Sequence, residues 1–194
     1  MIRVALFSLS CCLTSAAFAA STAINQLDAG HVMAGEKPVV LLGQGVKKGD
    51  IAPNFKVVDD KFMPVELSQF KNKPVLISVV PSLDTGICSL QTKHFNESVA
   101  AQCPDVEMLT ISADLPFAQK RFCKAENIDK ITTLSDSVWH DFGEKYGLII
   151  QDMGLLSRAV FILNKEHKII YKQLVPVLSK EPEYANVEAA LKTL

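Results

Sequence analysis

The sequence lacks several features that mark common protein classes: it has no Cys-x-x-Cys pair, no basic cluster and, after its first twenty residues, no long apolar run. Its 20 basic and 21 acidic residues give a net charge of −1, and basic residues adjoin only in pairs such as Lys47-Lys48. This balance argues against a nucleic acid or an anionic membrane as a partner, because both attract concentrated positive charge. A membrane-spanning helix needs about 20 apolar residues, so we expect no membrane partner either.

Repeats, low-complexity tracts and shifts in composition are also absent from the sequence. Repeat architectures are therefore excluded, and nothing indicates a second domain. We expect a single domain that is long enough to bury a core of its own.

The first residues have the order of a secretory signal. Arg3 precedes an apolar run of about ten residues, and Ala17-Phe18-Ala19 supplies the small residues of a cleavage site. We expect cleavage near Ala19 and a periplasmic or secreted protein. An alternative is a lipoprotein acylated at Cys11 or Cys12, although the residues before them match a lipid-attachment site poorly.

The expected organisation is a signal peptide at 1–19, a leader segment at 20–37 and one domain at 38–194. The leader is assigned because its residues are small and polar and precede the first clear apolar run. Cleavage would leave about 175 residues, which is the size of one domain.

Three cysteines, Cys88, Cys103 and Cys123, would remain after cleavage. An odd number in an exported chain leaves at least one thiol unpaired or only transiently paired. Their separations of 15 and 20 residues suit zinc poorly, and the four histidines are scattered instead of grouped with them. We therefore expect no metal and assign no cofactor.

Apolar runs alternate with amphipathic segments over most of the chain. The run KPVLISVVP predicts a strand buried on both faces, and Ile87–Gln102 predicts a helix with Leu90 and Phe95 on its apolar side. The remaining expected elements are an N-terminal hairpin followed by a strand to Val58, strands in VEMLTISAD and KITTLSD, helices at 116–125, in SVWHDFGEKYG and at 182–193, and a hairpin turning at 165–167. This order predicts an α/β, thioredoxin-like fold, with a mixed central sheet flanked by helices and an N-terminal β-hairpin extension.

Cys88 lies in the first turn of the helix expected after this buried strand. The unpaired backbone N–H groups and the positive end of the helix dipole favour an anion there, and the thiolate is the nucleophilic form of cysteine. Thr85 supplies a hydroxyl three residues earlier, and Pro81 ends the strand, so the spacing is Pro81-x-x-x-Thr85-x-x-Cys88. These parts suit a thiolate that attacks a peroxide O–O bond.

The segment PSLDTGIC resembles the peroxidatic motif of the peroxiredoxins, and ISADLPFAQKRFC resembles the segment with the resolving cysteine in their thiol peroxidase subfamily, the atypical two-cysteine type. GDIAPNF near the front and QLVPVLSKEPEY near the end are similar to the same subfamily. The resemblance extends over roughly residues 38–194.

The resemblance implies a thiol-dependent peroxidase that reduces hydrogen peroxide and organic hydroperoxides. Cys88 would attack the hydroperoxide and become a sulfenic acid, and Cys123 would condense with it to an intramolecular Cys88–Cys123 disulfide. Thr85 and Arg158 would hold the thiolate and polarise the peroxide, and Pro81 would shield the pocket. A thioredoxin-like dithiol reductant would restore both thiols, and the resemblance also implies a homodimer.

The chain departs from the subfamily pattern in its export signal and in residues 147–157, which look like a shortened loop without the usual proline. That region lies near the active-site entrance and the subunit contact in the family, so it bears on substrate preference and on dimerisation. The export signal bears on the reductant, because cytoplasmic thioredoxin would not be present.

Other interpretations of the cysteines stay open. Cys88 alone could be a small buried apolar residue, Cys123 could form a permanent structural disulfide with Cys88, and Cys103 reads as structural or incidental. An exported thiol-disulfide exchange protein of thioredoxin-like fold is the alternative function, but that class carries a Cys-x-x-Cys at the helix start, where position 85 is Thr. A non-enzymatic domain held by a disulfide is a weaker option.

Overall fold

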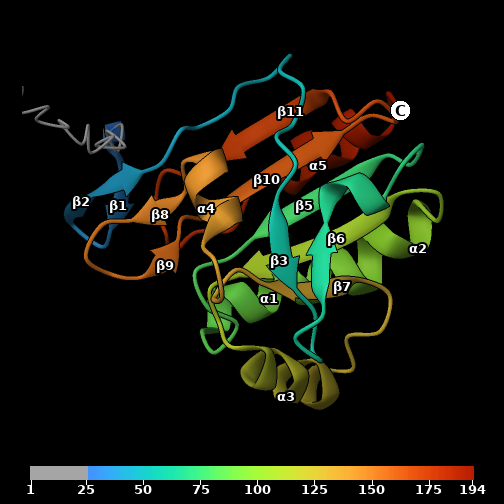
Figure 1. The fold of residues 1–194 in the computed structure, drawn as a ribbon, viewed down its shortest axis with the longest axis horizontal. Coiled ribbons are helices and arrows are strands. Elements are labelled where there is room, and N and C mark those ends of the chain that lie inside the picture. The colour runs from blue at the N-terminus through green and yellow to red at the C-terminus, as the bar shows by residue number, and fades with distance from the viewer. Residues whose placement is uncertain (1–25) are drawn as a thin grey trace, which may run out of the picture.

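Two sheets make up the framework of this computed structural model, which describes residues 26–194 (Figure 1). The expected signal peptide, with Ala19, Cys11 and Cys12, lies outside the described residues. The larger sheet has the order β11(Ile169–Leu174), β10(Ala159–Leu163), β5(Val75–Val79), β6(Glu107–Ser112), β7(Thr132–Ser135), β3(Lys56–Val58), β4(Pro64–Glu66). The smaller sheet has the order β1(Gln26–Ala34), β2(Lys37–Leu42), β8(Ile149–Ile150), β9(Leu155–Leu156).

The larger sheet is mixed, as predicted. β5 pairs in parallel with β6, and β6 with β7, whereas β10 is antiparallel to both β5 and β11. All five residues of β5 are buried, which confirms the strand covered on both faces. β11 ends the sheet, so the predicted final hairpin does lie at its edge.

Helices cover both faces of this sheet. The helical elements are α1(Gly86–His94), the π-helical turn η2(Phe95–Val99), α2(Ala100–Gln102), α3(Pro116–Glu126), α4(Asp141–Tyr146), α5(Tyr184–Leu191) and the 3-10 turn η1(Leu67–Gln69). Leu76 of β5 packs in one apolar cluster with residues of α1, α3 and α5, and its neighbour Ile77 packs in another with residues of α4. Alternation along one strand therefore gives the three-layered, thioredoxin-like arrangement that the sequence predicted.

The N-terminal hairpin begins earlier than predicted. β1 starts at Gln26, inside the segment expected to be a leader at 20–37, and pairs with β2 through a turn at Gly35. The leader assignment is therefore wrong from residue 26 onward. Its small, polar composition hid a strand whose Val32 is fully buried against β2 and β8, so tertiary packing outweighs local propensity here.

Residues 147–157 are also more ordered than the shortened loop that the sequence predicted. They contribute β8 and β9, which pair with each other, and β8 continues the N-terminal sheet by pairing with β2. The N-terminal hairpin and this distant segment therefore share one small core, in which Val32, Leu41 and Ile150 are buried.

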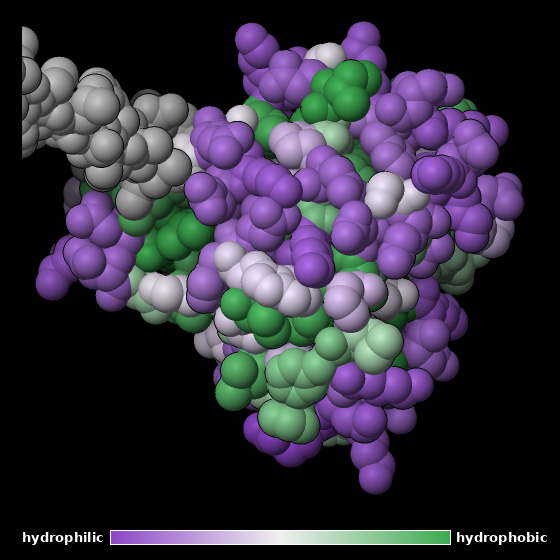
Figure 2. Space-filling view, viewed as in Figure 1, coloured by the Kyte–Doolittle hydropathy of each residue, from purple (hydrophilic) through white to green (hydrophobic). Residues whose placement is uncertain are grey.

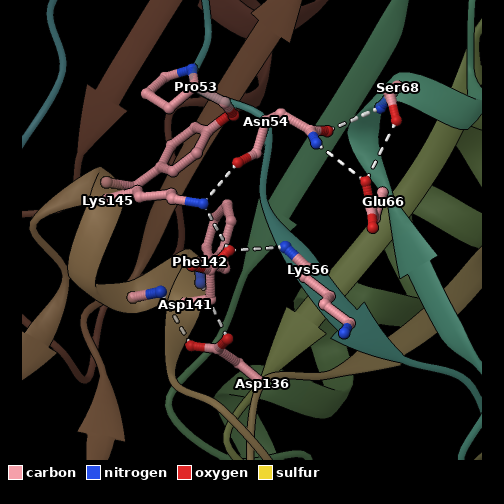
Figure 3. A network of polar contacts seen from close by, with 11 residues as sticks. Pro53, Asn54, Lys56, Glu66, Ser68, Asp136, Asp141, Phe142 and Lys145 are labelled. Carbon is pink, nitrogen blue, oxygen red and sulfur yellow. Dashed lines mark hydrogen bonds and ion pairs between the residues drawn. The ribbon is translucent and has the colours of Figure 1, made fainter.

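A polar network joins α4 to the chain before β3 (Figure 3). The Asp141 carboxylate accepts hydrogen bonds of 2.8 Å from the Lys56 backbone N–H and from Lys145 Nζ, and Lys145 also donates to the Asn54 carbonyl at 2.7 Å. Asp136 accepts from the backbone N–H groups of the first turn of α4, and burial nevertheless raises its pKa to about 7. These contacts fix α4 on the side of the sheet away from α1.

Apolar side chains gather on the surface around the β3–β4 hairpin and the start of α3 (Figure 2). We define this apolar patch by four residues that are 42 to 61% exposed: Phe62, Met63, Leu115 and Phe117. The centroids of the Phe62 and Phe117 rings lie 5.1 Å apart, which joins the two segments into one surface.

Within residues 26–194, no helix combines the length and the apolar character needed to cross a bilayer.

Gly43 should be the least replaceable glycine of the N-terminal sheet. Its φ of +123° is rarely adopted by other residues, and a Cβ there would collide with the Glu144 carbonyl oxygen at the end of α4. Gly43→Ala should lower the free energy of unfolding by about 2 to 4 kcal/mol, because neither backbone can yield easily. Urea unfolding measures this.

Gly35→Ala is the matched control. Gly35 also has a positive φ, of +63°, but a Cβ there meets nothing within 4 Å. This variant should lose only about 1 kcal/mol through backbone strain. Equal losses in the two variants would contradict the close approach of Gly43 to α4.

Candidate active site

The loop between β5 and α1 is held by one carboxylate. Asp114, which follows β6, accepts hydrogen bonds of 2.7 Å from the Ser82 hydroxyl and from the Leu83 backbone N–H. Because β5 and β6 are parallel neighbours, their carboxyl ends lie at the same edge of the sheet, and Asp114 ties the loop to that edge. The start of α1, with Cys88 in its first turn, is therefore fixed.

Cys88 and Arg158 lie against each other in the interior. Arg158 Nη2 donates to Cys88 Sγ at 3.2 Å, and the exposed fractions of the two residues are 1% and 0%. Arg158 directly precedes β10, and β10 pairs with β5, so strand pairing brings the arginine to the end of β5 where α1 begins. The sequence resemblance implied this juxtaposition of residues 70 positions apart, and the structure contains it.

Four hydrogen bonds orient the Arg158 guanidinium. Nη1 donates to Gln91 Oε1 at 2.6 Å, and Nε and Nη2 both donate to the Leu178 carbonyl, at 3.1 and 2.9 Å, in addition to the bond to Cys88. None of these three partners is a carboxylate. Since a buried charge is costly without an opposite one, the thiolate of Cys88 is the form that this arginine stabilises.

Gln91 belongs to the site but was missed in the sequence. Its Nε2 donates to the Ser78 hydroxyl of β5 at 2.8 Å, while its Oε1 accepts from Arg158. The predicted helix face was wrong at Leu90, which is 52% exposed, because the buried side of α1 carries Cys88 and Gln91. The available signals were the spacing of three between Cys88 and Gln91 and a serine within an apolar strand.

Thr85 and Pro81 precede the thiol in the chain, and within residues 26–194 neither forms a hydrogen bond to its sulfur. Thr85 is the exposed N-cap of α1, and its hydroxyl donates to the Ser82 carbonyl at 3.1 Å instead of to the sulfur. Pro81 is buried just after β5. The roles assigned to both by resemblance stay predictions.

Cys123 lies in the last turn of α3, half-buried at the rim of the apolar cluster that contains Cys88. Its sulfur is 3.2 Å from the Thr133 hydroxyl of β7, and both cysteines are free thiols in this structure. Burial raises the pKa of Cys123, and the bond to Thr133 offsets this only in part. A disulfide with Cys88 would therefore require each sulfur to leave a present partner.

Contacts with η2 fix the chain that follows α3. The Asn96 amide oxygen accepts from the backbone N–H groups of Asp129 and Lys130, and Lys93 Nζ lies 2.8 Å from Glu126 Oε2. The helix of Cys88 and the helix of Cys123 are thereby joined directly.

Cys103 packs against the same apolar cluster but faces a different hollow. It lines a hollow of about 700 Å³ together with residues such as Lys73 and Asp105, and neither Cys88 nor Arg158 takes part in that lining. Burial raises the pKa of its thiol. Within residues 26–194, no three His, Cys, Asp or Glu side chains are grouped so as to hold a metal ion.

Comparison with known proteins places this geometry in a family. Residues 47–191 match the Redoxin family. The thiol peroxidase of Staphylococcus epidermidis is 48% identical over 155 residues, which covers 80% of this chain and 92% of that protein. The thiol peroxidase of Bacillus subtilis is 46% identical over 157 residues, which covers 81% and 93%.

Among solved structures, a peroxiredoxin-like protein from Aquifex aeolicus superimposes with a TM-score of 0.79 at 42% sequence identity, covering 85% of this chain and 97% of that one. The similarity thus includes the strand, loop and helix that carry the thiol as well as the sheet. The chain belongs to the Redoxin family and, within it, to the thiol peroxidases.

Proposed function

We propose that this protein reduces hydrogen peroxide and organic hydroperoxides at the Cys88 thiol. The observation that carries the proposal is the buried Arg158 guanidinium, which donates to Cys88 Sγ and has no carboxylate among its hydrogen-bond partners within residues 26–194. It supports a thiolate in a site from which water is largely excluded. The family to which the chain belongs supports the same activity.

In the first step the Cys88 thiolate attacks the nearer oxygen of the hydroperoxide. The O–O bond breaks, the sulfur becomes a sulfenic acid, and the leaving oxygen takes a proton and departs as water or an alcohol. A guanidinium has five N–H donors, and four of those of Arg158 are used by the contacts described above. The remaining one, on Nη1, can donate to a peroxide oxygen, and Thr85 and Pro81 complete the proposed pocket.

In the second step the Cys123 thiol attacks the Cys88 sulfenic acid, and a disulfide and one water molecule form. A thioredoxin-like dithiol then reduces this disulfide by exchange, through a mixed disulfide, and is itself oxidised. Cys88 and Cys123 lie on two different helices, and each sulfur has another partner, so we expect local unwinding of at least one helix to accompany this step.

The signal-like first residues support export, with cleavage near Ala19 and a periplasmic or secreted location. The reductant would then be an exported dithiol protein. An exported thiol-disulfide exchange protein is less well supported, because no Cys-x-x-Cys occurs in the chain.

Replacement of the two cysteines should separate the two steps. With a chemical dithiol as reductant, Cys88→Ser should lose essentially all hydroperoxide consumption, because no other group supplies the nucleophile. Cys123→Ser should consume about one equivalent of peroxide per chain and then slow markedly. Cys103→Ser is the control and should resemble the unmodified protein. Continued turnover by Cys88→Ser would refute the proposed reaction.

The guanidinium geometry should matter more than its charge. Arg158→Lys keeps a positive charge but cannot bond Cys88, Gln91 and Leu178 at once, so the rate of the first oxidation should fall by about a hundredfold. Gln91→Met preserves size but removes one orienting bond, so a loss of about tenfold is expected. Single-turnover oxidation of Cys88 by hydrogen peroxide and by cumene hydroperoxide measures both. Unchanged rates in both variants would contradict the role of Arg158.

We also propose that the apolar patch of Phe62, Met63, Leu115 and Phe117 is the contact of a homodimer. Its exposed aromatic rings and its position at the start of the Cys123 helix support this. Phe117→Lys should shift the protein from dimer to monomer in sedimentation velocity, whereas the equally exposed Ile51, replaced by Lys, should not. A monomeric unmodified protein, or a dimeric Phe117→Lys variant, would reject this contact.

A further inference from the structure

Leu178 connects three parts of the molecule that the sequence does not relate. It lies between β11 and α5, in the QLVPVLSKEPEY segment, and its carbonyl oxygen accepts hydrogen bonds from both Nε and Nη2 of Arg158. These two bonds fix one edge of the guanidinium plane. The second hydrogen of Nη2 is thereby directed to Cys88 Sγ, 3.2 Å away.

The N-terminal strand β1 holds the backbone that presents this carbonyl. Met33 N–H donates to the Pro176 carbonyl at 2.8 Å, and Leu178 N–H donates to the Met33 carbonyl at 2.9 Å. Met33 and Val177 thereby form a parallel bridge outside the regular strands. The residue whose carbonyl binds the arginine is consequently tied to β1 through its own N–H.

The Leu178 side chain adds a third attachment. It packs against the core of the smaller sheet, where Val32, Leu41 and Ile150 are buried and Val39 is half-buried. One residue thus has its carbonyl on Arg158, its N–H on β1 and its side chain in the core below β1.

We propose that the N-terminal hairpin β1–β2 is a positioning element for the reaction, acting through Leu178 on Arg158. This inference rests on the proposed function and assigns a role to a segment whose buried residues lie in a different apolar cluster from Cys88. The hairpin fixes the carbonyl, the carbonyl fixes the plane of the guanidinium, and that plane decides whether Nη2 points at the sulfur and Nη1 at the peroxide. Misplacement of a catalytic group by about 1 Å can cost up to a hundredfold in rate.

The test compares two buried leucines of equal size. Leu41→Ala opens the core beneath β1, and Leu67→Ala opens the main core at η1. Both residues are at most 1% exposed, and the four hydrogen bonds of Arg158 go to other residues. For each variant, two rates are measured at Cys88 by mass spectrometry: oxidation by hydrogen peroxide and alkylation by iodoacetamide. Both rates are measured at a pH of about 10, where free cysteine is ionised, so that alkylation requires only a reachable thiolate, whereas oxidation also requires an oriented guanidinium.

We expect the ratio of the oxidation rate to the alkylation rate to fall about tenfold in Leu41→Ala and to stay within twofold in Leu67→Ala. Both variants should lose stability, so a purely structural role of the hairpin would leave the ratio unchanged in both. An unchanged ratio in Leu41→Ala, or an equal fall in both variants, overturns the inference.

Two further variants keep the test decisive if the leucine variants do not fold. Val39→Ala and Val65→Ala form a milder pair of half-buried valines, one in the hairpin core and one against the main core. The same contrast in the rate ratio is expected, with a smaller fall for Val39→Ala. Equal ratios for this pair overturn the inference as well.

A double replacement tests the route through Arg158. In an Arg158→Lys background, Leu41→Ala should change the oxidation rate no further, whereas independent effects would multiply. Failure of the proposed function would look different. In that case, the protein without substitutions would still consume peroxide after alkylation of Cys88. If that protein is inactive and the leucine variants behave alike, only the role of the hairpin is rejected.

Discussion

The structure depends on one electrostatic constraint, a guanidinium held inside the molecule without a carboxylate partner among residues 26–194. Arg158 is 1% exposed, and its oriented contacts are an amide oxygen, a backbone carbonyl and a thiol. A buried cation whose other partners are uncharged favours an anion at Cys88. The burial that makes this charge costly in isolation also strengthens its interaction with the thiolate.

Different elements of the fold supply the groups that surround the Cys88 sulfur. The pairing of β10 with β5 delivers the arginine, the first turns of α1 deliver Cys88 and Gln91, and the segment after β11 delivers the Leu178 carbonyl. Asp114 keeps the loop before α1 in place from the end of a parallel neighbour strand. Local helix chemistry and long-range strand pairing therefore converge on one sulfur atom, and neither is sufficient without the other.

Sequence patterns could predict the parts of this arrangement that are local. The apolar run of β5, the helix start at Cys88 and the final hairpin follow from periodicity and from turn residues, and the motifs around Cys88 and Cys123 identify the subfamily. Contacts over long separations were not accessible in the same way. A backbone carbonyl such as that of Leu178 has no residue signature. β1 has only one β-branched residue, Val32, so its order comes from the partner that covers it.

Ser78, Gln91, Arg158 and Cys88 form a polar row between β5 and α1, and its first two members were missed for a related reason. Ser78 and Gln91 occupy positions where an apolar residue would be the ordinary expectation, and Leu90 points outward although it is the more apolar neighbour. Their burial makes sense only once Arg158 is present to bond Gln91, which in turn bonds Ser78, because a buried amide without partners would destabilise the core.

The composition of that row, Ser78, Gln91, Arg158 and Cys88, also determines how protons are exchanged in the site. A serine hydroxyl and a glutamine amide do not ionise in the range where proteins are folded, and a guanidinium keeps its proton throughout that range. The row contains no carboxylate and no imidazole, so it offers no conventional general acid beside the sulfur. The proton that the leaving oxygen takes in the first step therefore has to come from the hydroperoxide itself or from solvent.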